Sequence, residues 1–251
     1  MSPPTIGVQL YTVRDACRDD FLGTLGAVSE MGYPAVEGFW SLFGLQPAVV
    51  RRTLDSLGLV MPSAHVDLET LEQRLDRAVE FWGELGCRTL VCPWVNEETR
   101  AGDGAWERLA DRLDRIGERL QAHGLSFAYH NHDFELASGE DRLAAMLDRC
   151  AADHLGLELD VFWVAHAGLE PAAYLRAKGP RVRLVHLKDG RHQPLAFTPL
   201  GEGEIDLAPV IAAAQDAGVG ALYVEQDDCE GDPFEALRCS AMTLCGMGLL
   251  C

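Results

Sequence analysis

The sequence predicts a single (β/α)8 barrel over residues 1–251, and three observations support this fold class. Short apolar runs rich in β-branched residues alternate with longer amphipathic runs, at a spacing of roughly 30 residues. No linker, low-complexity tract or change of composition divides the chain, and 251 residues is a usual length for one such barrel. Strands that alternate with helices pair in parallel through right-handed crossovers, and closure into a barrel is the economical arrangement.

Eight runs have the length and composition of strands. Each is short and apolar, and an amphipathic run separates it from the next. In chain order they are IGVQL (6–10), AVEGF (35–39), VMPSA (60–64), TLVCP (89–93), SFAYH (126–130), GLELD (156–160), RLVHLK (183–188) and ALYVE (221–225).

The runs between the strands place apolar residues at the i, i+3, i+4 spacing of a helix, as in 22–31, 71–82 and 109–120. Glycines follow such runs where the left-handed conformation that ends a helix costs glycine little. These are Gly32, Gly58, Gly86, Gly124 and Gly218. An open doubly wound sheet is the alternative fold, but the turn QLYTVRDACRDD after the first strand lacks the glycine pattern of a dinucleotide site.

The charge balance excludes several classes of partner. With 21 Lys and Arg against 39 Asp and Glu, the net charge is −18, so neither a nucleic acid nor an anionic membrane surface is expected. No apolar run approaches the roughly 20 residues of a membrane span, and MSPPTIGVQLY shows no signal peptide. Eight cysteines without a CxxC pair indicate reduced thiols. We expect a cytoplasmic protein, with a homo-oligomer as one arrangement.

Ionisable and aromatic side chains concentrate where the predicted strands end. In a barrel of parallel strands these ends meet in one ring, where the active sites of this architecture lie. Burying so many charges without compensation would cost several kcal/mol each, and a divalent metal ion would relieve the repulsion among the carboxylates. The side chains are Glu37, His65, Trp94, His130, Asn131, His132, Glu158, Asp160, His186, Lys188 and Glu225.

Motifs at successive strands form a series: GVQLYTVRD, GYPAVEGF, SAHVDLE, GCRTLVCPW, YHNHDFE, GLELDVFWVAHAG, VHLKD, GEGEID and YVEQD. As a set they resemble the sugar phosphate isomerase/epimerase family, the xylose-isomerase-like TIM barrels, over nearly the whole chain. The resemblance implies one divalent metal ion held by side chains from strands five to eight. Carried over residue by residue, these ligands are His130, Asp160, His186 and Glu225.

His130 departs from the family pattern, because many members have Glu at this position. Two carboxylates and two neutral imidazoles would neutralise a divalent ion and favour Mn²⁺ or Zn²⁺, with Co²⁺, Fe²⁺ and Mg²⁺ as alternatives. His132 could supplement or replace His130, since alternation along a strand puts both on one face.

The resemblance also implies proton abstraction next to a carbonyl in a sugar, keto-sugar or cyclic polyol. Glu225 keeps one of the family's two glutamate bases, and Glu158, His132 or Lys188 would return the proton or stabilise the intermediate. Isomerisation or epimerisation is the expected outcome, and dehydration of an inosose or keto-sugar is the alternative. A non-catalytic barrel that binds polyols is an alternative of another class.

Substrate contacts are expected around the mouth of the barrel, where aromatic faces pack on sugar C–H groups. The residues expected to make them are Glu37, His65, Trp94, Asn131 and Trp163.

GEGEID (201–206) is expected to turn into a helix with Asp206 as its N-cap. Phosphate binding is one role for such a turn, and the glutamates that flank it speak against that role. A related branch, the apurinic endonucleases with three zinc ions, is disfavoured. Trp163 stands where those enzymes carry a histidine, and the chain lacks a basic groove.

Overall fold

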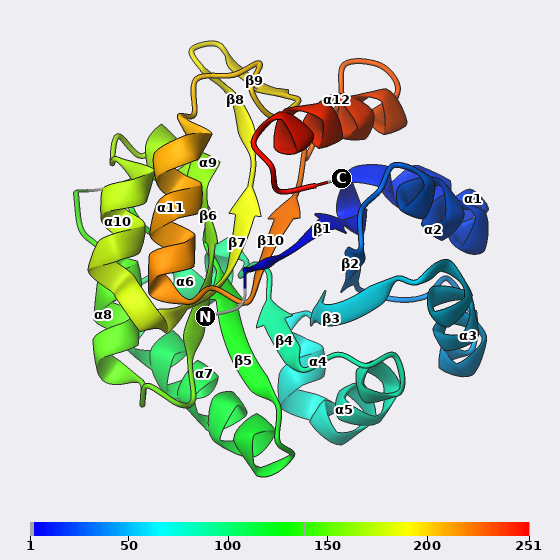
Figure 1. The fold of residues 1–251 in the computed structure, drawn as a ribbon. Coiled ribbons are helices and arrows are strands. Elements are labelled where there is room, and N and C mark those ends of the chain that lie inside the picture. Colours follow the sequence, from blue (N-terminus) through cyan, green and yellow to red (C-terminus); the bar gives the residue numbers. More distant parts are fainter. Residues whose placement is uncertain (1–2, 138, 251) are drawn as a thin grey trace.

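The computed structural model describes residues 3–137 and 139–250 and shows a closed barrel of eight parallel strands surrounded by helices (Figure 1). The predicted fold class is therefore confirmed. Around the barrel the strands follow the order β1–β10–β7–β6–β5–β4–β3–β2. Their bounds are β1 (Thr5–Gln9), β2 (Ala35–Phe39), β3 (Val60–His65), β4 (Thr89–Cys92), β5 (Ser126–His130), β6 (Gly156–Asp160), β7 (Val182–Leu187) and β10 (Ala221–Val224).

Helices connect the strands and cover the outside of the barrel (Figure 1). The predicted helix over 71–82 is two helices, because Arg74 leaves the helical conformation with φ −136° and ψ 30°. The helices are α1 (Arg14–Asp19), α2 (Phe21–Glu30), α3 (Pro47–Leu57), α4 (Leu68–Gln73), α5 (Leu75–Glu84), α6 (Glu97–Arg100), α7 (Ala105–Ala122), α8 (Arg142–Arg149), α9 (Val161–His166), α10 (Pro171–Lys178), α11 (Leu207–Ala217) and α12 (Pro233–Gly246), with 3-10 turns η1 (Leu10–Val13) and η2 (Gly179–Arg181).

An antiparallel hairpin of β8 (Asp189–His192) and β9 (Leu195–Thr198) lies between β7 and α11 and was not predicted. The ring of Phe197 in β9 lies 5.2 Å from that of Phe162 and 5.7 Å from that of Trp163, centroid to centroid. The hairpin therefore packs against α9, at the end of the barrel where the parallel strands terminate.

Successive residues of each barrel strand face alternately outward and inward. On β6, Leu157 and Leu159 belong to the large apolar core that includes the helices, whereas Glu158 and Asp160 pair with side chains of other strands inside the barrel. The small apolar cluster of the interior consists of Val91, Ala128, Leu184, Ala221 and Tyr223. Towards the carboxyl ends of the strands the interior is polar.

Three smaller predictions concern helix ends, thiols and membranes. The glycines predicted at helix ends adopt positive φ angles between 68° and 94°, as expected of a left-handed terminus. Cysteines in the described ranges form no disulfide; Cys251 lies outside them. Among the helices of these ranges, none is both long and apolar enough to cross a bilayer.

Candidate active site at the carboxyl ends of the strands

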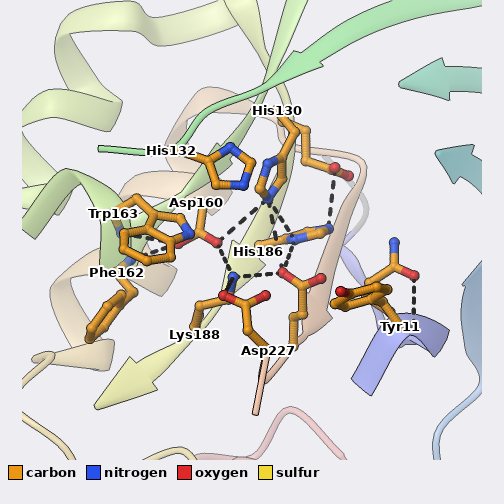
Figure 2. A network of polar contacts seen from close by, with 12 residues as sticks. Tyr11, His130, His132, Asp160, Phe162, Trp163, His186, Lys188 and Asp227 are labelled. Carbon is orange, nitrogen blue, oxygen red and sulfur yellow. Dashed lines mark hydrogen bonds and ion pairs between the residues drawn. The ribbon is translucent and has the colours of Figure 1, made fainter. Parts of the chain in front are cut away.

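Four side chains predicted as metal ligands converge inside the barrel (Figure 2). His130, Asp160 and His186 lie on β5, β6 and β7, and Glu225 directly follows β10. His130 Nε2 lies 3.1 Å from His186 Nδ1 and 3.5 Å from Asp160 Oδ2. His186 Nδ1 lies 2.9 Å from Glu225 Oε2. The four side chains are buried, and one potential ligand atom of each lies within 4.8 Å of the others.

This donor set suits a divalent transition metal. Tetrahedral coordination with bonds of about 2.0–2.2 Å places neighbouring ligand atoms about 3.3–3.6 Å apart. The separations here, from 2.9 to 3.9 Å, bracket that range. Two imidazole nitrogens that face each other need either a shared proton or a cation between them. The residues present therefore fit a metal ion.

Lys188 brings a positive charge into the same cluster (Figure 2). Its Nζ lies 2.9 Å from Asp160 Oδ2, 2.9 Å from Glu225 Oε2 and 3.0 Å from Asp227 Oδ2. Burial alone would lower the pKa of Lys188, but these carboxylates raise it well above its ordinary value. For Asp160 the directions are reversed: burial alone would raise its pKa, but the charge of Lys188 brings that pKa below its ordinary value. The lysine therefore stays protonated and keeps Asp160 and Glu225 ionised.

His186 also joins a second buried cluster through its other ring nitrogen. Its Nε2 lies 2.8 Å from Glu37 Oε2 and 3.2 Å from Glu158 Oε2. On the far side, His65 Nε2 lies 2.6 Å from Glu158 Oε2 and 3.3 Å from Glu37 Oε2. Burial lowers the pKa of His65, but Glu37 and Glu158 outweigh it and raise that pKa to about 9. Two imidazoles and two carboxylates thus balance one another, and this group too has donors that could hold a metal ion.

A cavity of about 410 Å³ lies at the mouth of the barrel above both clusters. Its lining residues are Tyr11, Phe39, Trp40, His65, Asp67, Pro93, Trp94, His130, His132, Glu225 and Asp227. A larger hollow of about 620 Å³ lies between α2 and α12 on the outside of the barrel, and none of the predicted site residues lines it. The cavity at the mouth is therefore the candidate substrate site.

Of the residues predicted to bind substrate, three lie on or just after β2, β3 and β4. His65 and Trp94 line the cavity. Glu37 is fully buried and is not among the lining residues. Gln9 Nε2 donates to its Oε2 at 2.7 Å, and Ser63 Oγ donates to its Oε1. Glu37 is therefore held inside the barrel by donors from two neighbouring strands.

Asn131 and Trp163 also lie outside the cavity lining and contact residues that form the site. Asn131 Oδ1 accepts from the backbone N–H of Asp160 at 3.0 Å, and its Nδ2 donates to the Asp160 carbonyl at 3.3 Å. The Trp163 ring lies 5.8 Å from the ring of His132, centroid to centroid. Asn131 thus fixes the end of β6 relative to β5, and Trp163 supports His132 from behind.

Two of the predicted catalytic groups differ in access. His132 lines the cavity, and burial, followed by the charges of His130 and Lys188, holds its pKa well below the ordinary value. It is therefore a neutral imidazole at pH 7. Glu158 is fully buried and does not line the cavity. His65, which lines the cavity, contacts the Glu158 carboxylate at 2.6 Å and separates it from the cavity.

The sequence prediction missed several residues of the lining, and four of them share one signal. Each lies two positions after an inward-facing residue, so strand alternation carried the signal that could have found them. The four are Tyr11 after Gln9, Phe39 after Glu37, Asp67 after His65 and Asp227 after Glu225.

A closed parallel barrel with buried imidazoles and carboxylates below a mouth cavity defines a TIM-barrel protein with residues that could hold a metal. Residues 25–240 match the xylose isomerase-like TIM barrel family, and the chain belongs to it. An inosose dehydratase of Geobacillus kaustophilus is 26% identical over 253 residues, covering 84% of this chain and 82% of that protein.

Solved structures share the fold. A sugar phosphate isomerase/epimerase of Parabacteroides distasonis superimposes with a TM-score of 0.85 at 21% identity, covering 100% of this chain and 96% of that one. An L-ribulose 3-epimerase superimposes with a TM-score of 0.76 at 17% identity, covering 98% and 94%. At such identities the likeness establishes the fold alone.

Proposed function

We propose that this protein is a metal-dependent enzyme that removes a proton next to a carbonyl group in a sugar, keto-sugar or cyclic polyol. The observation that carries the proposal is the convergence of two imidazoles and two carboxylates at a cavity of about 410 Å³. His130, Asp160, His186 and Glu225 would hold one divalent ion, and the mixed nitrogen and oxygen donors favour Mn²⁺ or Zn²⁺. When bound, the ion would supply polarisation of the substrate carbonyl.

Glu225 is the proposed base. It borders the cavity, and although burial alone would raise its pKa, Lys188 and His186 lower that pKa well below the ordinary value, so it is ionised at neutral pH. His132, neutral and at the cavity surface, is the proposed second proton-transfer group. Lys188 stays charged, so it cannot act as a base, and it would stabilise negative charge that develops on the substrate.

Dehydration is the outcome that we favour over isomerisation or epimerisation. Both outcomes begin with the same proton abstraction, and the geometry of the chain's own residues supports either. Curated relatives that match much of this chain, such as the Geobacillus kaustophilus protein, are named inosose dehydratase. Epimerisation is the second candidate, because it needs the same proton abstraction by Glu225 and return of the proton by a second group such as His132.

The test incubates the protein with Mn²⁺ or Zn²⁺ and a panel of inososes and ketoses in D₂O. Loss of water with a new conjugated carbonyl absorbance identifies a dehydratase, and deuterium gained beside the carbonyl without loss of water identifies an isomerase or epimerase. The Glu225→Gln variant should exchange deuterium at least about 100-fold more slowly, since it lacks the base. Binding of a polyol without exchange or loss of water would instead support a non-catalytic binding protein.

A further inference from the structure

The turn GEGEID forms a cradle of backbone N–H groups that the chain fills itself. The N–H groups of Gly201, Gly203 and Ile205 donate to the carboxylate of Asp189 at 2.9, 3.1 and 3.0 Å. The N–H of Gly190 also donates to it, at 2.8 Å. Asp189 is fully buried, and a Cβ at position 203 would lie 2.1 Å from its Oδ1. The turn is thus built around this internal carboxylate.

In TIM barrels the loops after strands seven and eight often bind phosphate, and converging backbone N–H groups are the usual anion site. Here the loop after β7, the seventh barrel strand, has those groups committed to Asp189. Asp206 lies at the N-cap position of α11, as predicted, but its side chain makes no capping hydrogen bond. The N–H groups that a phosphate would need at this turn are therefore already bonded to the Asp189 carboxylate.

Two helix N-termini near the cavity are filled in the same way. Asp67 caps α4, accepting from the N–H of Thr70 at 2.8 Å. Asp160 caps α9 with Oδ1, which accepts from the N–H groups of Phe162 at 3.0 Å and Trp163 at 3.1 Å. Free N–H groups at a helix start are what a phosphate would use. These two helices present a carboxylate there instead.

The nearby cations are also paired. Lys188 contacts three carboxylates, as described above. Arg14 donates to the carbonyls of Tyr11 at 3.1 Å and Asp227 at 2.8 Å, and lies 3.5 Å from the Asp228 carboxylate. The cavity lining in the described ranges contains the carboxylates of Asp67, Glu225 and Asp227 and no lysine or arginine. The charged imidazole of His65 in this lining is already bonded to Glu158 at 2.6 Å.

We propose that this site takes only uncharged polyhydroxy carbonyl compounds and rejects phosphorylated or carboxylate-bearing ones. The proposal rests on the function proposed above and narrows its substrate class. An anionic group would meet carboxylates on the wall and find the surrounding N–H groups and cations already bonded. The aromatic rings of Tyr11, Phe39, Trp40 and Trp94 offer apolar faces to the C–H side of an uncharged ring or chain.

Calorimetric titration of the Mn²⁺-loaded protein tests the proposal. The ligands are L-ribulose, D-fructose and scyllo-inosose, each beside a phosphate monoester of the same carbon skeleton, with inorganic phosphate as a further probe. We expect at least one neutral compound to bind, its ester to bind roughly 100-fold more weakly, and inorganic phosphate not to displace it. Higher salt should narrow the difference, since it screens like charges.

An ester that binds as tightly as its parent compound, or more tightly, would overturn the proposal while leaving the proposed chemistry intact. Failure of every neutral compound and every ester to bind would overturn the proposed function, and the substrate class with it. The two failures are therefore distinguishable in one experiment.

A pair of matched variants tests whether charge causes the exclusion. Asp67→Asn removes a charge at the mouth but keeps a good N-cap. Asp20→Asn is the control, because Asp20 caps α2 through the N–H of Gly23 at 2.9 Å, the same three-residue pattern, and does not line the cavity. Asp67→Asn should reduce the ratio of the affinity for the neutral compound to the affinity for its ester about fivefold, and Asp20→Asn should leave this ratio unchanged. Equal preference in all three proteins would count against the proposal.

Discussion

The outer and inner faces of the barrel strands differ in how their side chains are stabilised. On the outer face, residues such as Leu159 and Leu222 are fully buried in the apolar core. On the inner face near the carboxyl ends, residues such as Glu158 and Lys188 are equally buried, but each is charged and contacts groups of opposite charge. Truncation of an outer-face side chain therefore leaves a cavity, whereas removal of one inner-face partner leaves a buried charge without compensation.

The largest effect on stability is expected from the inner face. Lys188→Met leaves Asp160 and Glu225 buried without their cation, which should lower the free energy of unfolding by about 3–5 kcal/mol. Urea denaturation measures this change. Added Mn²⁺ should restore part of it, because a divalent ion would neutralise the same carboxylates.

Lys178→Met is the matched control for that variant. Its Nζ pairs with Asp141 Oδ2 at 2.6 Å in a more exposed position. An exposed pair contributes about 1 kcal/mol or less. If both lysine variants lost the same small amount, with no response to Mn²⁺, the inner face would not depend on charge pairing as described.

A slightly smaller loss is expected on the outer face. Leu222→Ala should lower the free energy of unfolding by about 3 kcal/mol, because it leaves a cavity in the apolar core. Metal affinity should change by less than about twofold, since Leu222 faces away from the ligands. A metal titration that showed a large loss in this variant would mean that the two faces are not independent.

The smallest effect concerns a carboxylate next to the outer core. Burial raises the pKa of Glu135 from 4.5 to about 7, and the donors Tyr129 Oη and His132 N offset this only in part. The folded state therefore binds more protons than the unfolded state between these values, so stability should fall by about 2–3 kcal/mol as pH rises from 4.5 to 7. Glu135→Gln should remove most of that slope in denaturation curves measured across this range. A slope that survives would assign the pH dependence to other groups.

The strands could be predicted well from their outer faces, because burial under helices requires only apolar, β-branched side chains there. The runs AVEGF (35–39), SFAYH (126–130) and GLELD (156–160) coincide with β2, β5 and β6. The hairpin was missed because β9 is half-buried or exposed at every residue, so no apolar run marks it.

The inner face could be predicted only in part. Alternation indicates which residues face inward, but not how deep they lie or which groups they meet. Glu37 bonds to Gln9, 28 residues away, and to His186, 149 residues away. Such pairs depend on barrel closure, so Glu37 was predicted at the cavity and lies below it. Asn131 was also predicted to contact substrate but does not line the cavity, because its side-chain amide bonds to the backbone of the neighbouring strand.

Metal titration of three proteins tests the central claim, that His130, Asp160, His186 and Glu225 hold a divalent ion. The wild type, Asp160→Asn and Glu158→Gln would be titrated with Mn²⁺ and Zn²⁺ in competition with a chelating dye. Asp160 and Glu158 lie on the same strand and face, but in different buried clusters. We expect Asp160→Asn to weaken metal binding by more than about 100-fold and Glu158→Gln to weaken it by no more than about tenfold. The reverse order, or no binding by the wild type, would contradict the claim.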